Sequence, residues 1–254
     1  MREEATATRF AGLVAPQVVP VPAAIRPGRP APWADLPAAR RRGLSVARVE
    51  ARLAARGQGV ADPVAGPVPD GSAGLRDSAV LVALYDVAGE AHVVLTRRAR
   101  SLRDHAGEVA LPGGRVEAGE SLVAAARREA AEEVGLDPTA VRPLGWLAPL
   151  ITRVSGSVIW PVVAALAGPP ILVPSPAEVE VAFDVALADL AGEGSYLEEL
   201  WQREPGGAAF PISFFRGPAD LIWGATARVL VDLVCVAVGV APRDPEPLDD
   251  GPVD

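Results

Sequence analysis

The chain has 254 residues and half of them are hydrophobic, so it can form one domain with extensions, or two small domains, around a substantial core. Its formal net charge of −8 argues against a general binder of nucleic acids or of anionic membranes. The single cysteine, Cys235, has no partner for an internal disulfide and lies in an apolar run. We therefore expect a buried thiol and a reducing, cytoplasmic environment.

Residues 1–75 are expected to form an N-terminal extension ahead of the main domain. Residues 1–35 are rich in proline and are predicted to be extended or partly disordered. Residues 39–57 have a basic pattern typical of one or two short helices, and residues 59–74 have the composition of a linker. Prolines interrupt the early apolar stretch, so it is a poor match to a signal peptide.

Residues 76–241 are predicted to form the main domain. Strand patterns occupy residues 78–86 and 91–96, and Ala88-Gly89 between them is typical of a tight turn. Further strand-like runs are expected at 144–150, 158–166 and 179–183. A short helix is expected near Leu187, and a long helix from Leu221 onward. The tail, residues 242–254, is acidic and rich in proline and is predicted to be mobile.

The apolar stretch from Leu221 to Ala241 is long enough to suggest a transmembrane helix. Arg228 and Asp232 interrupt it at a spacing of one helical turn, so their charges could pair on one face. Charged residues are rare in membrane spans. We therefore predict a buried amphipathic helix that packs on the domain.

The stretch LPGGRVEAGESLVAAARREAAEEVGL, residues 111–136, combines a glycine pair with a dense cluster of glutamates. Gly113 and Gly114 predict a loop. Ser121 is a suitable N-cap for the helix-forming residues that follow, and Gly135 stands where that helix would end. The segment therefore predicts a loop followed by a helix.

Three glutamates are expected to share one face of this helix. Glu132 and Glu133 lie three and four residues after Glu129, which is about one turn. A solvated helix face would explain many glutamates, but these lie near the C-terminal end, where the helix dipole disfavours negative charge. A bound hard cation such as Mg²⁺ or Mn²⁺, which takes oxygen ligands, would remove that penalty.

The spacing in this segment resembles the signature of the Nudix hydrolases. Five residues separate Gly114 from Glu120, and seven separate Glu120 from Arg128. The run from Arg128 to Leu136 fits the pattern REUxEExGU, in which U is aliphatic and x is any residue. The resemblance implies an α/β fold, the Nudix α/β/α sandwich with a mixed β-sheet. It also implies metal-dependent hydrolysis of a nucleoside diphosphate linked to another group X.

The resemblance also implies roles for individual residues. Glu129 and Glu133 are the leading metal ligands, and Glu132 follows them. Glu120 and Arg128 complete the catalytic set, and Arg128 is interpreted mainly as a structural partner that fixes the loop against the helix. The reaction would be attack of a metal-activated water on one phosphorus atom. The general base stays open between these glutamates and a residue of another loop, namely Glu178 or Glu180.

The residues just before this signature resemble the accessory motif of the coenzyme A pyrophosphatase branch of the family. That motif consists of LLTxR, a small residue, three residues, R, three residues, G, three residues and FPGG. The matching residues are Leu95, Thr96, Arg98, Ala99, Arg103, Gly107 and Pro112-Gly113-Gly114. Val94 and Leu111 depart from it, and the missing aromatic ring at 111 leaves open how the substrate is held. Residues 174–183 and 222–230 also resemble this branch.

Coenzyme A is strongly anionic, so an acidic protein needs a local patch of positive charge to bind it. Arg97 and Arg100 either join such a patch or are ordinary surface residues. His105 either orients a phosphate or packs within its loop. The candidate substrate-binding residues are Arg98, Arg103, His105, Gly113 and Gly114.

Two other functions stay open. One is a Nudix hydrolase for a different nucleotide, such as ADP-ribose or NADH. The other is a non-catalytic module that senses nucleotides, although binding alone would not need the whole set of glutamates. The expected partner is a small molecule, with no nucleic acid and no membrane, and a homodimer is compatible with the sequence. The sequence does not choose among free, oxidised and acylated coenzyme A.

Overall fold

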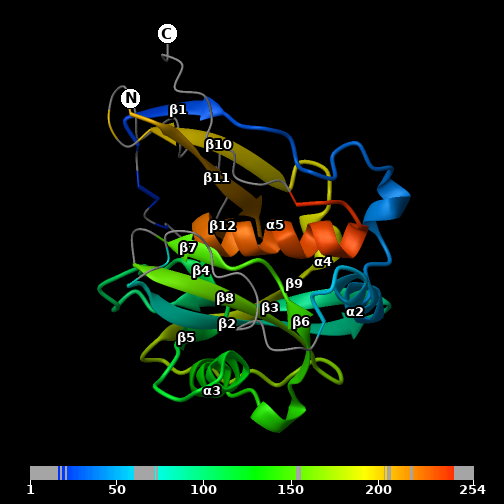
Figure 1. Ribbon diagram of the computed structural model, residues 1–254, viewed down its shortest axis with the longest axis vertical. Helices are drawn as coiled ribbons and strands as arrows, with labels where there is room; N and C mark the ends of the chain where they lie inside the picture. The colour runs from blue at the N-terminus through cyan, green and yellow to red at the C-terminus, as the bar shows by residue number, and fades with distance from the viewer. Residues whose placement is uncertain are drawn as a thin grey trace.

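The computed structural model describes residues 17, 19–20, 22–59, 72, 74–152, 156–202, 204, 207–217 and 220–242. These residues form two β-sheets, one of eight strands and one of four. Helix α5 (Gly224–Val238) lies between the two sheets, and helix α3 (Leu122–Val134) covers the far face of the larger one (Figure 1). The α3–sheet–α5 stack is the predicted α/β/α sandwich, and the smaller sheet adds a further layer.

The larger sheet is mixed, as expected. Strand β2 (Arg76–Val87) pairs in parallel with β8 (Ser157–Ala165) and antiparallel with β3 (Glu90–Arg98). The predicted turn between β2 and β3 is present, with positive φ angles of 50° at Ala88 and 84° at Gly89. The other strands are β4 (Val109–Ala110), β5 (Gly113–Arg115), β6 (Arg142–Trp146), β7 (Leu150–Thr152) and β9 (Val179–Ala186).

The smaller sheet contains strands that the sequence did not predict. Its order is β1-β10-β11-β12. These strands are β1 (Ala24–Pro27), β10 (Tyr196–Gln202), β11 (Ala209–Arg216) and β12 (Leu221–Trp223). The long helix predicted from Leu221 was therefore placed three residues too early, because the chain first completes β12 and only then begins α5 at Gly224.

The described part of the N-terminal region packs on the same body. The basic stretch forms η1 (Ala38–Arg41) and α2 (Val46–Ala55), which confirms the predicted helical pieces. Trp33, Leu44 and Leu53 are buried in the core that α5 also fills. The predicted linker and the predicted tail lie almost wholly outside the described residues.

Helix α5 is buried on nearly every side, and the prediction of a packed helix is confirmed. Arg228 and Asp232 pair on it, with 2.7 Å between Nη1 and Oδ1. Cys235 is buried in this helix, as predicted. In the part of the chain that the structure describes, no helix has the length and hydropathy needed to span a membrane.

Two short elements complete the fold, η3 (Pro138–Ala140) and α4 (Leu187–Leu190).

Candidate active site

Local sequence forms the helix that carries the glutamates. The Ser121 hydroxyl accepts a hydrogen bond from the Ala124 N–H at 3.2 Å, which caps the first turn of α3. Gly135 ends the helix with a φ of 70°, a conformation that favours glycine. Ala126 and Ala130 are buried against the larger sheet. Glu133 is buried on the same side, where it contacts Gly113 of β5, whereas the side chain of Glu132 is exposed.

The glycine pair brings the backbone close to these charges. Strand β5, which contains both glycines, pairs with β2. A Cβ atom added at Gly113 would overlap the carbonyl oxygen of Ala79, and one added at Gly114 would overlap the carboxylate of Glu129. The overlap at Gly113 is with backbone, so only glycine fits there, whereas a side chain at Gly114 would force the Glu129 carboxylate to move. The loop backbone therefore lies directly against the Glu129 carboxylate.

Arg128 connects the loop to the helix. Its Nε and Nη2 donate to the two carboxylate oxygens of Glu120 at 3.0 and 3.1 Å, and Nη2 also donates to the Arg115 carbonyl at 2.9 Å. Its Nη1 donates to Glu129 at 2.9 Å and to Glu132 at 3.3 Å. The hydrogen bonds from Arg128 hold the pKa of Glu120 below its usual value. This geometry supports the structural interpretation of Arg128.

Glu133 differs from the other glutamates because it is buried. Its side chain accepts a hydrogen bond from the Gly113 N–H at 3.1 Å, and its other oxygen lies 4.0 Å from Nη1 of Arg98. Burial raises the pKa of Glu133 to about 7, although the Gly113 N–H and the Arg98 charge both oppose that rise. Burial also raises the pKa of Glu129. Glu132, by contrast, is 61% exposed.

The acidic side chains suit a hard cation by their chemistry. The negative charge of Glu178 contributes to the raised pKa of both Glu129 and Glu133, so these carboxylates crowd one another. Across the described ranges, however, no three acidic, histidine or cysteine side chains converge on one point. Two of the three proposed ligands, Glu129 and Glu132, instead accept hydrogen bonds from Arg128. The oxygen donors fit Mg²⁺ or Mn²⁺, and an ion would compete with Arg128 for Glu129.

Two arginines before the loop are engaged in ion pairs. Arg97 Nη1 donates to both carboxylate oxygens of Asp220, at 2.8 and 3.0 Å. Arg97 also lies 3.6 Å from Glu180, and Arg100 Nε donates to Glu180 at 3.2 Å. Of the two readings left open for Arg97 and Arg100, the geometry favours a structural role. Glu180 is paired with these arginines, whereas the negative charge of Glu178 acts on Glu129 and Glu133.

The motif arginines are placed differently. Nε of Arg98 is buried without a hydrogen-bond partner, beside Glu133. Arg103 is exposed, and none of the ion pairs and hydrogen bonds found among the described residues involves it. His105 has a φ of 58° and lies with Nδ1 2.9 Å from a Glu108 oxygen, a hydrogen bond that raises the pKa of His105. His105 is thus held within its loop, while Arg98 and Arg103 retain unused donors.

Sequence reasoning did not find Asp220. It lies just before β12 and is buried, and its partner Arg97 is 123 residues away in the chain. No local pattern distinguishes Asp220 from an ordinary loop aspartate.

Comparison with known proteins agrees with the sequence signature. The family model described as NUDIX domain matches residues 75–200. The "Uncharacterized Nudix hydrolase NudL" of Photorhabdus laumondii is 38% identical over 142 residues, which cover 56% of this chain and 74% of that protein. Nudix hydrolase 22, chloroplastic, and Nudix hydrolase 15, mitochondrial, both of Arabidopsis thaliana, are 38% and 36% identical. Those two matches cover 61% of this chain but only 53% and 56% of the plant proteins.

Among solved structures, the chain is similar to RenU, a Nudix hydrolase from M. Smegmatis. The sequence identity is 26% and the TM-score is 0.39. The match covers 44% of this chain and 70% of that one.

Proposed function

This chain belongs to the Nudix hydrolase family, and from that premise we propose that it hydrolyses the pyrophosphate bond of coenzyme A or a derivative. The products would be 3′,5′-ADP and 4′-phosphopantetheine, or its acylated form. The observation that carries the proposal is the contrast among four neighbouring arginines. Arg97 and Arg100 form ion pairs with Asp220 and Glu180 at 2.8 to 3.6 Å. Of the two arginines at the accessory motif positions, Arg98 has only a longer contact of 4.0 Å, to Glu133, and Arg103 is exposed with no ion pair or hydrogen bond among the described residues, so these two are better placed to meet phosphate oxygens.

Nudix hydrolases generally use divalent metal ions, and we propose Glu129, Glu133 and Glu132 as the residues that hold Mg²⁺ or Mn²⁺ here. When bound, such ions activate water and neutralise the charge that develops on phosphate oxygens. The protein contributes the placement of these ligands. Arg128 and Glu120 fix the loop, and the loop backbone fixes Glu133 through the Gly113 N–H.

The proposed reaction is a displacement at phosphorus. A water oxygen forms a new bond to one phosphorus, the P–O bond to the bridging oxygen breaks, and that oxygen leaves on the other phosphate. A carboxylate must accept the proton of the attacking water. Glu178 fits this role better than Glu180, because Glu178 is exposed and its charge acts on Glu129 and Glu133, whereas Glu180 is paired with arginines.

The experiment that tests the proposal is a substrate panel with purified protein and Mg²⁺ or Mn²⁺, read by product mass. We expect coenzyme A to yield 3′,5′-ADP and 4′-phosphopantetheine. If coenzyme A stays intact while ADP-ribose or NADH is cleaved well, the protein acts on another nucleoside diphosphate derivative. A cytoplasmic location, indicated by the buried free thiol of Cys235, and a homodimeric assembly remain predictions.

A further inference from the structure

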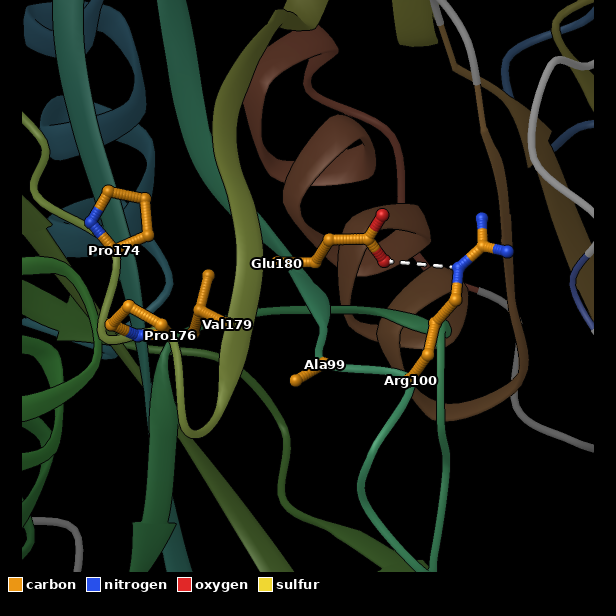
Figure 2. A pocket seen from close by; sticks show the side chains of 6 residues that line it. All are labelled: Ala99, Arg100, Pro174, Pro176, Val179 and Glu180. Carbon is orange, nitrogen blue, oxygen red and sulfur yellow. Dashed lines mark hydrogen bonds and ion pairs between the residues drawn. The ribbon is translucent and has the colours of Figure 1, made fainter.

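A pocket of about 500 Å³ opens beside the candidate site. Its lining residues are Ala99, Arg100, Pro174, Pro176, Val179 and Glu180. Figure 2 shows Pro174, Pro176 and Val179 grouped where the chain enters β9, with the Glu180 carboxylate turned toward Arg100. The walls are therefore mainly apolar, and the two charged residues of the lining face each other.

This pocket adjoins the proposed chemistry on two sides. Ala99 directly follows Arg98, which lies 4.0 Å from Glu133. On the other side, the Ser175 N–H donates to the Glu133 carbonyl at 2.8 Å, so the proline-rich turn rests on the end of α3. If the pyrophosphate of a substrate lies at the glutamates, the group attached to one of its two phosphates would lie in this pocket.

The lining is poorly suited to phosphate. Arg100 Nε donates to Glu180 at 3.2 Å, which cancels the only cationic charge in the lining. An additional phosphate there would have to displace Glu180 or lie near its negative charge. Arg103, which is exposed and has no ion pair or hydrogen bond among the described residues, offers an anion a better site outside the pocket.

The lining is equally poor in backbone donors. Pro174 and Pro176 have no N–H group. The Ala99 N–H donates to the Glu178 carbonyl, and the Val179 N–H donates to the Ser175 carbonyl, both at 2.8 Å. Recognition of a polar ligand group uses placed donors and acceptors, and these four residues offer no N–H for that purpose. An apolar group is the better occupant.

We propose that this pocket binds the start of the pantetheine arm, a specificity site that rests on the proposed function. In coenzyme A, the second carbon after the pyrophosphate carries two methyl groups. In ADP-ribose, a hydroxylated sugar occupies the same place. Methyl groups gain from burial against proline, valine and alanine side chains, whereas sugar hydroxyls would lose hydrogen bonds to water there. The pocket thus selects coenzyme A over sugar nucleotides through the group X.

The test compares two substrates that share their ADP half. Dephospho-coenzyme A and ADP-ribose differ only in X. Pro176→Ser and Val179→Thr each make the pocket more polar, and Val179→Thr does so while keeping a β-branched side chain. We expect each to lower kcat/KM for dephospho-coenzyme A by about tenfold while ADP-ribose changes less than about twofold. The matched control is Ile171→Ser, in the same connection but 88% exposed and outside the lining.

Other patterns of loss overturn the inference, and if the wild type does not cleave ADP-ribose, the comparison of the two products decides. Equal losses on both substrates would mean that the pocket holds the shared ADP half or only shapes the loop. No loss on either would make it a surface feature without a ligand. A wild-type enzyme that cleaves ADP-ribose but neither form of coenzyme A would overturn the proposed function and this inference together. Cleavage of coenzyme A without selective losses would overturn the inference alone.

Product inhibition provides a second readout that reports the binding of each half of the substrate separately. The two products of coenzyme A each carry one half of the substrate. We expect Pro176→Ser and Val179→Thr to raise the inhibition constant of 4′-phosphopantetheine about tenfold and to leave that of 3′,5′-ADP unchanged. A rise for 3′,5′-ADP instead would assign the pocket to the nucleotide half.

Discussion

At the scale of single residues, Glu129 and Glu133 are held by different means. Glu129 is bound by a side chain, Arg128, whereas Glu133 is bound by the backbone N–H of Gly113. A side chain can move away when an ion arrives, but the backbone of a paired strand is nearly fixed. Glu133 is therefore the better positioned of the two before any ion binds, and Glu129 is the adjustable one.

The first prediction concerns the role of both carboxylates. Replacing either by glutamine keeps its shape but removes the charge that a divalent cation needs. Glu129→Gln and Glu133→Gln should each lower kcat by roughly 100-fold or more with little loss of folding. Activity of the wild type should vanish in excess chelator. Glu193→Gln, on an exposed loop, is the control. Near-normal turnover in both variants would remove these glutamates from the ligand set.

A second prediction separates recognition of the 3′-phosphate from chemistry. Coenzyme A and dephospho-coenzyme A differ only in that phosphate. Arg98→Ala or Arg103→Ala should lower kcat/KM for coenzyme A by about tenfold, since a hydrogen bond to a charged group contributes roughly 1.5–3 kcal/mol. The dephospho substrate should barely change, and Arg40→Ala, on the exposed η1, should affect neither. Equal losses on both substrates would point to contact with the pyrophosphate instead.

At the scale of elements, the ion pair between Arg97 and Asp220 joins the two sheets. Arg97 belongs to β3 of the larger sheet, and Asp220 immediately precedes β12 of the smaller one. Both side chains are largely buried, at 17% and 5% exposure. The pair lies beside Arg98, so it also fixes the end of the strand that leads to the candidate site.

The third prediction follows from that burial. Asp220→Asn leaves the largely buried Arg97 guanidinium with the Glu180 carboxylate, at 3.6 Å, as its remaining ion-pair partner, so it should lower the free energy of unfolding by roughly 2–4 kcal/mol. The exposed pair of Glu50 and Arg142 gives the contrast, and Glu50→Gln should cost less than about 1 kcal/mol. Urea unfolding of both variants makes the comparison. Similar small losses would show that the Asp220 pair does not link the sheets energetically.

The same elements show what sequence can predict. The β2–β3 hairpin and α3 were found because their turn residues and caps act within a few positions. Strand β10 was missed because Glu198 and Glu199 make it look polar, although both are buried. Glu198 is satisfied by the N–H and side chain of Arg29, 169 residues away. Such partners exist only in the folded chain.

The candidate site likewise has features that the local sequence predicts and features that only the folded chain shows. The spacing of the α3 glutamates and of Glu120 and Arg128 is local, and it led to the correct family. The partners of Arg97 and Arg100 come from β9 and from the residue before β12, so sequence left their role open. The pocket beside Ala99 is also formed by two distant segments. Local spacing thus predicts the chemistry, and long-range contacts decide what surrounds it.

At the scale of the whole molecule, the site imposes a cost on stability that depends on pH. The pKa of Glu133 is about 7 in the folded protein against 4.5 for the ordinary group, so the folded state binds this proton more tightly. Without metal, stability should therefore fall as pH rises from about 4.5 to 7 and should stay reduced above that range. This is the expected cost of keeping a carboxylate buried for function.

The fourth prediction uses that cost. In chelator at pH 8, Glu133→Gln should be more stable than the wild type, by on the order of 2–3 kcal/mol at most, because the amide carries no charge to bury. Near pH 4 the difference should largely disappear. Thermal melts at both pH values measure it, with Glu193→Gln as the control. A variant less stable than the wild type at pH 8 would show that the Glu133 charge is favourable even without an ion.

Helix α5 has a consequence for the order of events in the cell. It fills the space between the two sheets, yet the ribosome makes it after every strand of both sheets. Until α5 emerges, the core between the two sheets lacks its central helix, although the core under α3 contains no residue of α5. The two sheets can therefore be joined into one body only after α5 is made, whereas the layer of α3 on the larger sheet can form earlier.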